Sequence, residues 1–242
     1  SQSQYKMISS GDRHSLALKS DGTVVAWGDN EWDQLDIPEG LNSVVSISAG
    51  YVHSMALKSD GTVVAWGLNN YGQANVPSDL NDVISIAAGS IVSMALKSDG
   101  TVVVWGSNNY DQINVPDNLT NVKSSVSGGF HSMALKTDGT VVAWGINNYG
   151  QATVPADLND VVSIAASHKH SIALKSDGTI VGWGNNNFGQ IDAPEGLNDV
   201  ISISVGYSHS IALKRDGTVV AWGDNDYGQT NVPEGLNNVV SI

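Results

Sequence analysis

The chain of 242 residues contains no cysteine. This absence excludes disulfide bonds, thiolate zinc sites and cysteine nucleophiles. Basic residues are also scarce, since 11 Lys and Arg stand against 24 Asp and Glu, which gives a net charge of −13. Nucleic-acid affinity comes mainly from Lys and Arg side chains that neutralise phosphates. The charge balance therefore argues against a nucleic-acid partner and against an anionic membrane surface.

Long apolar runs are missing as well. The longest are short stretches such as residues 101–105, whereas a membrane helix needs roughly 18 apolar residues. Residues 1–7 lack the charged start and apolar middle of a signal peptide. Apolar residues nevertheless make up 41% of the chain and charged residues only 14%. This composition is sufficient for a core and differs from that of a disordered polyelectrolyte.

A 39-residue repeat organises the whole chain. The dipeptide Trp-Gly occurs six times at this step, from Trp27 to Trp222. The six prolines keep the same step, and so do six Asp-Gly-Thr triplets that begin at Asp21. No insertion or deletion interrupts the array. We therefore expect a single domain over residues 1–242, built from six repeats.

Each repeat contains the pattern of a β-hairpin. In the first repeat, residues 14–19 and 23–27 flank the dipeptide Asp21-Gly22. Asp-Gly between alternating segments indicates a two-residue turn in which both residues have positive φ. That turn would pair residues whose numbers add to 43, so that Leu16 faces Trp27.

Two further short strands are expected in each repeat, near residues 34–37 and 44–48 of the first. Four short antiparallel strands per 39-residue repeat, six times over, predict an all-β, six-bladed β-propeller. An open β-solenoid is the alternative, but its repeats are usually shorter and lack this hairpin. Residues 5–8 and 239–242 share one repeat phase, so we expect that one segment closes the ring and the other is displaced. Displaced strands allow a strand-swapped oligomer as well as a monomer.

All six units resemble one known repeat. The pattern Ala-Gly-x-x-His-Ser-x-Ala-Leu-Lys-x-Asp-Gly-x-Val-x-x-Trp-Gly-x-Asn-x-x-Gly-Gln is similar to the repeat of the regulator of chromosome condensation. The compact form, with Val-Pro after the Gln, most resembles the bacterial branch that contains β-lactamase inhibitory protein II. This resemblance implies a secreted bacterial protein whose loops on one face make aromatic contacts with a target enzyme. Family members usually have seven blades, and this chain has six repeats.

The six copies differ mainly at two places, the pair of residues before the His and the residue after Trp-Gly. Hairpin pairing places both at the end opposite the Asp-Gly turn. Positions that are identical in all copies are expected to maintain the fold, whereas positions that differ among the copies are expected to contact a partner. The binding residues predicted at these positions are Asp12, Arg13, Asp29, Tyr51, Val52, Leu68, Ile91, Phe130, Ile146, Lys169, Tyr207 and Asp224.

The divergent positions are apolar in repeats two to four and mainly polar in repeats five, six and one. We call the apolar part the apolar sector, and it consists of Tyr51, Val52, Leu68, Ile91, Phe130 and Ile146. A contiguous apolar patch beside a polar arc is typical of a protein-binding surface. Drift among tolerant loop positions is the alternative, although drift at exposed positions should favour polar residues.

A third set of residues is aromatic in every repeat. Its members are Trp32, Tyr71, Tyr110, Tyr149, Phe188 and Tyr227. Each ring either packs over its own Asn-x-x-Gly-Gln loop or belongs to an aromatic rim for sugars or a protein. Under the second interpretation Trp32 and Tyr71 are further candidate binding residues.

The motifs of metal and catalytic sites are weak in this chain. His recurs at one phase from His14 to His209, but Val92 replaces it in the third repeat, which favours a structural hydrogen bond over a metal ring. His168 and His170 alternate without a third zinc ligand. The acidic loops near residues 29 and 224 lack the glycine and the terminal glutamate of calcium loops and are expected to be Asn-anchored turns. No catalytic triad, phosphate loop or dinucleotide fingerprint is found, so we expect no cofactor, no metal and no enzymatic activity.

The sequence therefore predicts non-catalytic binding of a protein partner through the variable loops of one face. The resemblance implies an inhibitor of a secreted enzyme such as a β-lactamase, and Tyr51, Phe130 and Tyr207 match the family's aromatic position. A lectin-like glycan-binding module is one alternative. An idealised or recently amplified scaffold with no partner is another. The nucleotide-exchange activity of eukaryotic relatives on a small GTPase is disfavoured, because a 39-residue period leaves no room for the wedge it requires.

Overall fold

The computed structural model describes residues 4–242, and strands and turns but no helices occur in this range. Among these residues there is accordingly no helix with the length and apolar character to cross a membrane. Each repeat supplies three strands. The first strands are β1 (Tyr5–Ser10), β4 (Val44–Ala49), β7 (Val83–Ala88), β10 (Val122–Ser127), β13 (Val161–Ala166) and β16 (Val200–Val205).

The second and third strands of each repeat form its hairpin. The second strands are β2 (His14–Lys19), β5 (His53–Lys58), β8 (Val92–Lys97), β11 (His131–Lys136), β14 (His170–Lys175) and β17 (His209–Lys214). The third strands are β3 (Val24–Gly28), β6 (Val63–Gly67), β9 (Val102–Gly106), β12 (Val141–Gly145), β15 (Ile180–Gly184) and β18 (Val219–Gly223).

Two compact units divide the chain, with the boundary between Phe130 and His131. The first unit holds β1 to β10 and the second holds β11 to β18. In the five repeats that lie within one unit, the three strands form an antiparallel sheet in chain order. The single domain over residues 1–242 stays a prediction.

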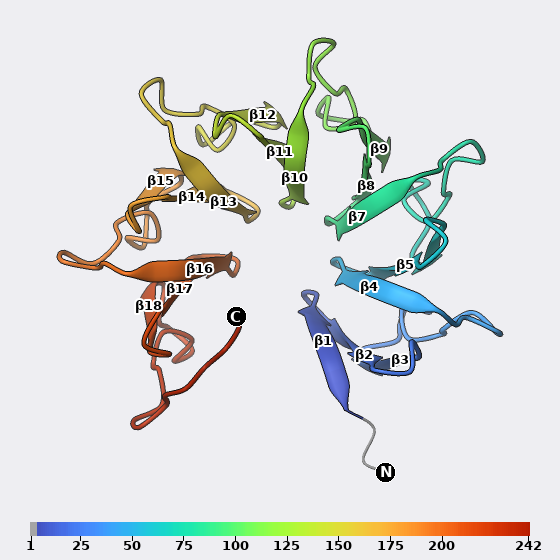
Figure 1. Ribbon diagram of the computed structural model, residues 1–242, viewed down its shortest axis with the longest axis horizontal. Helices are drawn as coiled ribbons and strands as arrows, with labels where there is room; N and C mark the ends of the chain where they lie inside the picture. Colours follow the sequence, from blue (N-terminus) through green and yellow to red (C-terminus); the bar gives the residue numbers. More distant parts are fainter. Residues whose placement is uncertain (1–3) are drawn as a thin grey trace. The chain divides into compact units, whose positions relative to one another are not determined.

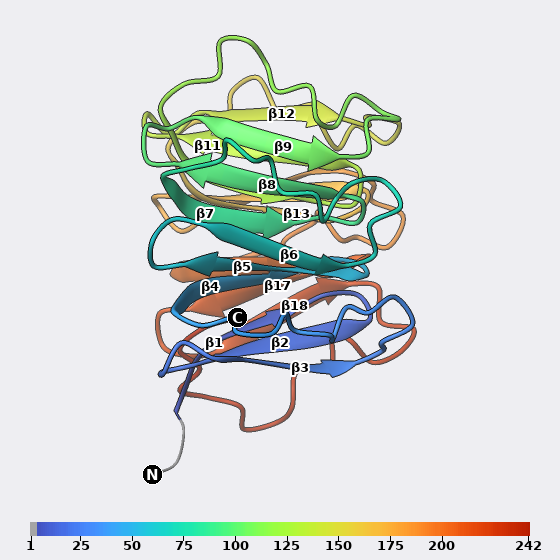
Figure 2. The same ribbon diagram turned by 90° about the vertical axis from the view of Figure 1, so that its right-hand side faces the viewer.

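Within each unit, successive sheets stack face to face. In the first unit, β1, β4, β7 and β10 lie side by side along one edge of the stack (Figure 1). The sheets of that unit are seen one above the next in Figure 2. Leu16 and Leu18 of the first sheet are fully buried against Val44, Ile47 and Trp66 of the second. Apolar layers between sheets therefore form the core, and an equivalent layer lies between the last two sheets of the second unit.

The hairpin register differs by one residue from the predicted register. In the first repeat Leu16 pairs with Ala26 and Ser15 pairs with Trp27, so the paired numbers add to 42. The other five hairpins have the equivalent pairing. The prediction that Leu16 faces Trp27 is therefore wrong. The Leu residues lie on one face of the sheet and the Trp lies on the other. The two faces pack against different neighbouring sheets.

The turn explains the shift of register. The N–H of Gly22 donates to the carbonyl of Lys19 at 3.0 Å, and the N–H of Lys19 donates to the carbonyl of Thr23 at 2.9 Å. This is a three-residue loop, a type I turn followed by a left-handed glycine. Gly22 has φ +83°, whereas Asp21 is not left-handed. Asp21 instead accepts the N–H of Thr23 at 2.9 Å, and all six Asp-Gly turns share this bond.

The fourth strand predicted in each repeat, near residues 34–37 of the first, is absent from the described chain. Asp33 has φ +58°, and every equivalent residue is also left-handed, which breaks an extended path. Asn30 then braces the loop, because its Oδ1 accepts the N–H of Leu35 at 2.8 Å and its Nδ2 donates to Asp36 at 2.9 Å. The segment is an Asn-anchored loop, so each repeat has three strands and not four.

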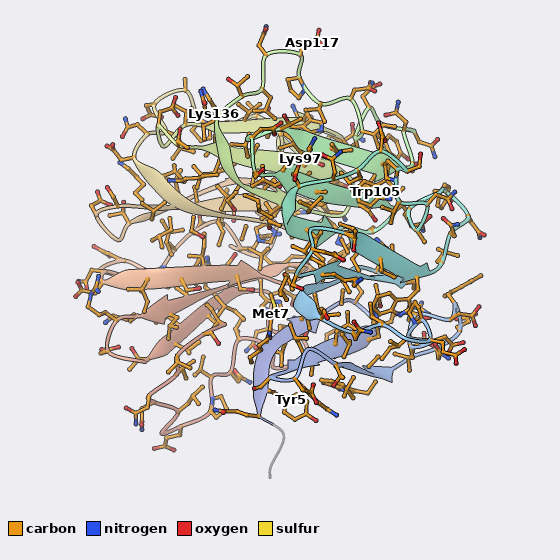
Figure 3. The ribbon with its side chains drawn as sticks, turned by 45° about the vertical axis from the view of Figure 1, so that its right-hand side comes forward. Tyr5, Met7, Lys97, Trp105, Asp117 and Lys136 are labelled. Atoms are coloured by element: carbon orange, nitrogen blue, oxygen red, sulfur yellow. The ribbon has the colours of Figure 1, made fainter. Side chains whose placement is uncertain are left out.

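The two segments that share a repeat phase differ in structure. Residues 5–10 form β1, which pairs with β2. Residues 239–242 form no strand, although the N–H of Val239 donates to the carbonyl of Gly217 at 3.1 Å. Tyr5 and Met7 of β1 are 54% and 38% exposed (Figure 3). Only one of the two segments is therefore a strand.

Candidate functional site

The two variable positions of a repeat meet at the open end of its hairpin. The N–H of Asp29 donates to the carbonyl of Arg13 at 2.9 Å, and the N–H of Asn185 donates to that of Lys169 at 2.8 Å. In the third repeat, Lys97 marks the turn end of the hairpin and Trp105 lies near the open end (Figure 3). The predicted placement of both positions opposite the turn is confirmed. We call this region the variable end.

The apolar sector lies partly at the surface. Its half-buried members are Tyr51, Leu68, Ile91, Phe130 and Ile146, whereas Val52 is 1% exposed. Phe130 meets the ring of Tyr110 edge to face, with 5.8 Å between ring centroids. This contact joins a variable position to the aromatic set of the preceding repeat. The variable pair of the fourth repeat and the aromatic residue of the third therefore contribute to one surface.

In the first repeat the variable end carries a cation that is paired within the chain. Arg13 Nη1 lies 3.3 Å from Asp29 Oδ2 and 3.4 Å from Glu31 Oε2. Its guanidinium lies over the ring of Tyr51 at 5.5 Å from the centroid. The hydrogen bond with Asp29 raises the pKa of Arg13, and the backbone N–H of Glu31 lowers the pKa of Asp29. Asp12, beside them, is exposed.

In the fifth repeat a second cation lies between two aromatic rings. Lys169 Nζ is 5.1 Å from the ring centroid of Tyr149 and 5.5 Å from that of Tyr207. The ring of His168 lies 4.8 Å from that of Tyr207. We call these four residues the aromatic–lysine cluster. In the sixth repeat Asp224 accepts the N–H of Asp226 at 3.0 Å, in a turn like that of Asp29.

The aromatic set combines an anchored backbone with an exposed ring. The N–H of Trp32 donates to Gln34 Oε1 at 2.8 Å, and that of Tyr71 donates to Gln73 Oε1 at 3.0 Å. Both glutamines are fully buried, but Trp32 is 41% and Tyr71 is 48% exposed. The other four members have the same bond and are at least as exposed as Trp32. The invariant Gln therefore holds the loop, and the ring is left at the surface.

The recurring histidines form buried links between successive repeats. His14 Nε2 lies 2.8 Å from Ser54 Oγ, which donates to the carbonyl of Gln34 at 2.9 Å. That carbonyl also accepts Trp66 Nε1 at 3.0 Å. Because Ser54 uses its proton on Gln34, the His must donate from Nε2. His53, His131 and His170 make the same contact, so the predicted structural hydrogen bond is confirmed.

Burial keeps these histidines neutral. Desolvation lowers the pKa of His53 to about 3 and that of His131 and His170 to about 4. Neutral imidazoles can ligate metals, but each Nε2 is already engaged with a serine. Among residues 4–242, no group of three or more His, Asp or Glu side chains is placed to hold a metal ion.

Sequence reasoning missed two contacts at the variable end. It did not pair Glu31 with Arg13, and it did not place Tyr149 against Lys169. The second follows from an offset between neighbouring repeats, since Tyr110 and Phe130 are separated by the same 20 residues as Tyr149 and Lys169, whereas Arg13 and Glu31 lie in one repeat. Contacts at this offset depend on how sheets stack, which the sequence of one repeat does not contain.

Comparisons with known proteins agree with this architecture. Six segments match the family described as "Regulator of chromosome condensation (RCC1) repeat": residues 6–31, 44–73, 83–112, 122–151, 161–190 and 200–229. A search of curated proteins gave no match.

Solved structures with similar folds cover most of the chain. Prp20p from Saccharomyces cerevisiae, described with its binding properties to Gsp1p and histones, shares 24% identity at a TM-score of 0.78, over 93% of this chain and 72% of that one. Yeast RCC1 (Prp20) bound to Kap60 has 23% identity and a TM-score of 0.80, and the match covers 97% of this chain and 73% of that one. Human WBSCR16 has 20% sequence identity and a TM-score of 0.77, and the match covers 99% of this chain and 81% of that one. The predicted all-β propeller fold class is confirmed, with three strands in each repeat.

Proposed function

The chain belongs to the regulator of chromosome condensation repeat family, and from this premise we propose that it is a non-catalytic protein that binds a protein partner at the variable end. One observation carries the proposal. Apolar side chains such as Tyr51, Leu68 and Phe130 occupy half-buried positions at the ends of hairpins whose other positions repeat almost unchanged. Apolar residues at partly exposed sites, rimmed by charges, are the usual composition of a protein interface. The binding of Prp20p to other proteins is consistent with such a role.

Capture on immobilised protein tests this proposal. Three baits are compared: the unchanged chain, a Tyr51→Ala, Leu68→Ala, Phe130→Ala variant, and a control with Lys58→Ala, Lys97→Ala and Lys136→Ala at the turn end. The control removes three side chains from the turn end of the hairpins in repeats two, three and four. All three baits must first show similar thermal unfolding.

The expected result is a protein that the unchanged chain and the turn-end control retain and the variable-end variant loses. Truncation of central interface residues costs about 1 to 4 kcal/mol each, which is sufficient to remove a micromolar partner. Equal capture by all three baits would contradict the proposal and favour drift at the variable end.

A finer proposal concerns the kind of partner. We propose a secreted hydrolase such as a class A β-lactamase, supported by the resemblance of the compact repeat and by the aromatic residues Tyr51, Phe130 and Tyr207 at the matching position. Tyr207 is 54% exposed and Tyr51 is half-buried. Assay of the hydrolase with micromolar protein should show inhibition that the variable-end variant lacks. Full hydrolase activity would remove this proposal and leave general protein binding intact.

Glycan binding is the second candidate, because the rings of the aromatic set are exposed while their backbones are held. Such rings can stack on sugar faces, one shallow site per repeat. A glycan array with the unchanged chain and Tyr71→Ala distinguishes the two. Signals that Tyr71→Ala reduces would favour the sugar, whereas a blank array and intact protein capture by Tyr71→Ala would exclude it.

A further inference from the structure

The variable end has two cations, and they differ in their pairing. Six of the eleven basic residues are the Lys that ends each second strand at the turn. Only Arg13 and Lys169 occupy the variable positions. Arg13 is paired with two carboxylates. Among the described residues, Lys169 has no carboxylate within ion-pair distance.

The difference arises at two matched positions of the repeat. Asp29 and Glu31 of the first repeat correspond to Asn185 and Asn187 of the fifth. Both loops have the same local turn, because Asp29 Oδ1 accepts the N–H of Glu31 at 2.9 Å and Asn185 Oδ1 accepts the N–H of Asn187 at 3.1 Å. The fifth repeat therefore keeps the loop and the cation but has amides where the first repeat has acids.

The Asn185 amide is not free to replace the missing acid. Its Oδ1 also accepts Gln190 Nε2 at 2.9 Å, and the residue is only 9% exposed. Lys169 itself is held by the rings of Tyr149 and Tyr207, which are 46% and 54% exposed. Aromatic faces attract an ammonium group, but they provide no oxygen atoms to accept hydrogen bonds from its N–H groups.

The loop that carries Lys169 is braced in a way that other repeats are not. Ser167 stands where the other repeats have glycine. Its hydroxyl lies 2.7 Å from His170 Nδ1 and accepts the backbone N–H groups of Lys169 and His170, each at 3.3 Å. Because His170 Nε2 lies 3.1 Å from Ser210 and carries the proton, Ser167 donates to Nδ1. A fixed loop lowers the entropy lost on binding.

From these contacts we propose that the aromatic–lysine cluster receives a Glu or Asp side chain of the protein partner, with the carboxylate on Lys169 and the adjoining apolar atoms on Tyr149 and Tyr207. The inference rests on the proposed function and names the chemistry that the partner presents. Lys is a compact charge that suits a single carboxylate. An acidic sugar fits less well, because Asn185 Oδ1 already accepts two hydrogen bonds within its loop and is not available to sugar hydroxyls.

Nuclear magnetic resonance with defined peptides tests the proposal. The probe is the end-capped tripeptide Phe-Glu-Phe, with Phe-Gln-Phe as the neutral control of the same shape. The readouts are the side-chain signals of Lys169 and Tyr207. We expect saturable shifts with the Glu peptide and at least about tenfold weaker binding of the Gln peptide, since hydrogen bonds between charged groups are roughly twice as strong as neutral ones.

The chain itself provides the matched variant. Asn185→Asp with Asn187→Glu copies the acids of the first repeat and keeps the turn, so Lys169 remains but gains internal carboxylates. The variant should bind the Glu peptide at least about tenfold more weakly, and Lys169→Arg should keep binding. Equal shifts with both peptides, or unchanged binding by the double variant, would overturn the proposal. Tighter binding of methyl glucuronide than of the Glu peptide would also overturn it, in favour of a sugar.

The proposal and the proposed function fail in different ways. If the unchanged chain captures a partner that the variable-end variant loses, while the Glu peptide causes no shift, protein binding stands and the carboxylate site is wrong. If the peptide binds at Lys169 but all baits capture equally, the apolar sector is not the interface. A captured partner that the double variant of Asn185 and Asn187 also loses would support both.

Discussion

At the scale of single residues, the buried His–Ser links determine how the protein responds to acid. His53 is fully buried, and its pKa falls from the ordinary value of 6.5 to about 3. The unfolded chain binds a proton at this residue below about pH 6.5, whereas the folded chain does so only near pH 3. The stability contributed by the neutral imidazole is therefore complete above pH 6.5 and is lost as the pH falls toward 3.

This argument predicts the pH dependence of unfolding. Between about pH 6 and pH 4, His53 should lower the free energy of unfolding by at most about 1.4 kcal/mol per pH unit, and His131 and His170 should do so above about pH 5. The aspartates of the turns act mainly below this window, because the pKa of Asp60 and that of Asp138 fall from the ordinary value of 3.8 to about 2, and the stability they contribute is lost between these two values. Urea unfolding at several pH values gives the slope.

His53→Val is the matched variant, since Val92 occupies this phase in the third repeat and is fully buried there. At pH 7 the variant should lose about 1 kcal/mol with the hydrogen bond to Ser93. Its stability should fall less steeply with acid, so the difference from the unchanged chain should shrink or reverse near pH 4.5. Parallel curves for the two proteins would show that His53 does not titrate on unfolding.

At the scale of elements, the hairpin turn fixes which side chains share a face. Gly61, the turn glycine of the second repeat, has φ +82°, and a Cβ there would meet only ordinary contacts at 3.5 Å or more. The requirement for glycine is therefore one of backbone conformation and not of space. Gly61→Ala should destabilise the protein by about 1 to 2 kcal/mol.

Asn tolerates the left-handed region better than Ala. Gly61→Asn should therefore cost clearly less than Gly61→Ala, although its side chain is larger. Thermal unfolding of the two variants measures the difference. Equal destabilisation would indicate that crowding, and not the positive φ, excludes a side chain at this turn.

The elements that could be predicted were those with a strong local signature. The hairpin, its Asp-Gly turn and the first strand of each repeat followed from alternation of apolar residues. The register did not, because Asp-Gly is compatible with two loop lengths, and one extra residue in the loop moved Trp27 from opposite Leu16 to opposite Ser15. The expected fourth strand failed for a similar reason, since Asp33 is left-handed in a loop whose sequence also suits extended backbone.

The candidate site could be predicted from the sequence to a similar extent. Comparing the repeats with one another located the variable end correctly. It could not show that Val52 is buried, or that Lys169 lies between Tyr149 and Tyr207, because these facts depend on packing between sheets. Pairing of Arg13 with Glu31 likewise depends on the path of the loop after Trp27.

At the scale of the whole molecule, stability follows from stacking of near-identical repeats. The first strand of the first repeat is much less buried than its equivalents, since Ile8 is 71% exposed and Ile47 of the second repeat is 2% exposed. Trp27 is 50% exposed, whereas Trp66 is 7% exposed. The first repeat therefore buries less apolar surface than the interior repeats.

Hydrogen exchange should report this difference. Local opening costs less where fewer apolar contacts are broken, so amides of β1 should exchange at least about tenfold faster than those of β4. Mass spectrometry of peptides that cover residues 4–10 and 43–49 gives the comparison. Equal protection of the two strands would show that the face of the first repeat is covered in solution.

The central claim is that a partner binds at the variable end, and site-specific crosslinking tests it most directly. A photoreactive phenylalanine replaces Phe130 at the variable end in one protein and Lys97, which is labelled in Figure 3, at the turn end in another. Both are exposed to the same extract and irradiated. The account predicts a crosslinked partner from position 130 and none from position 97. Crosslinking from position 97 alone, or equally from both, would contradict it.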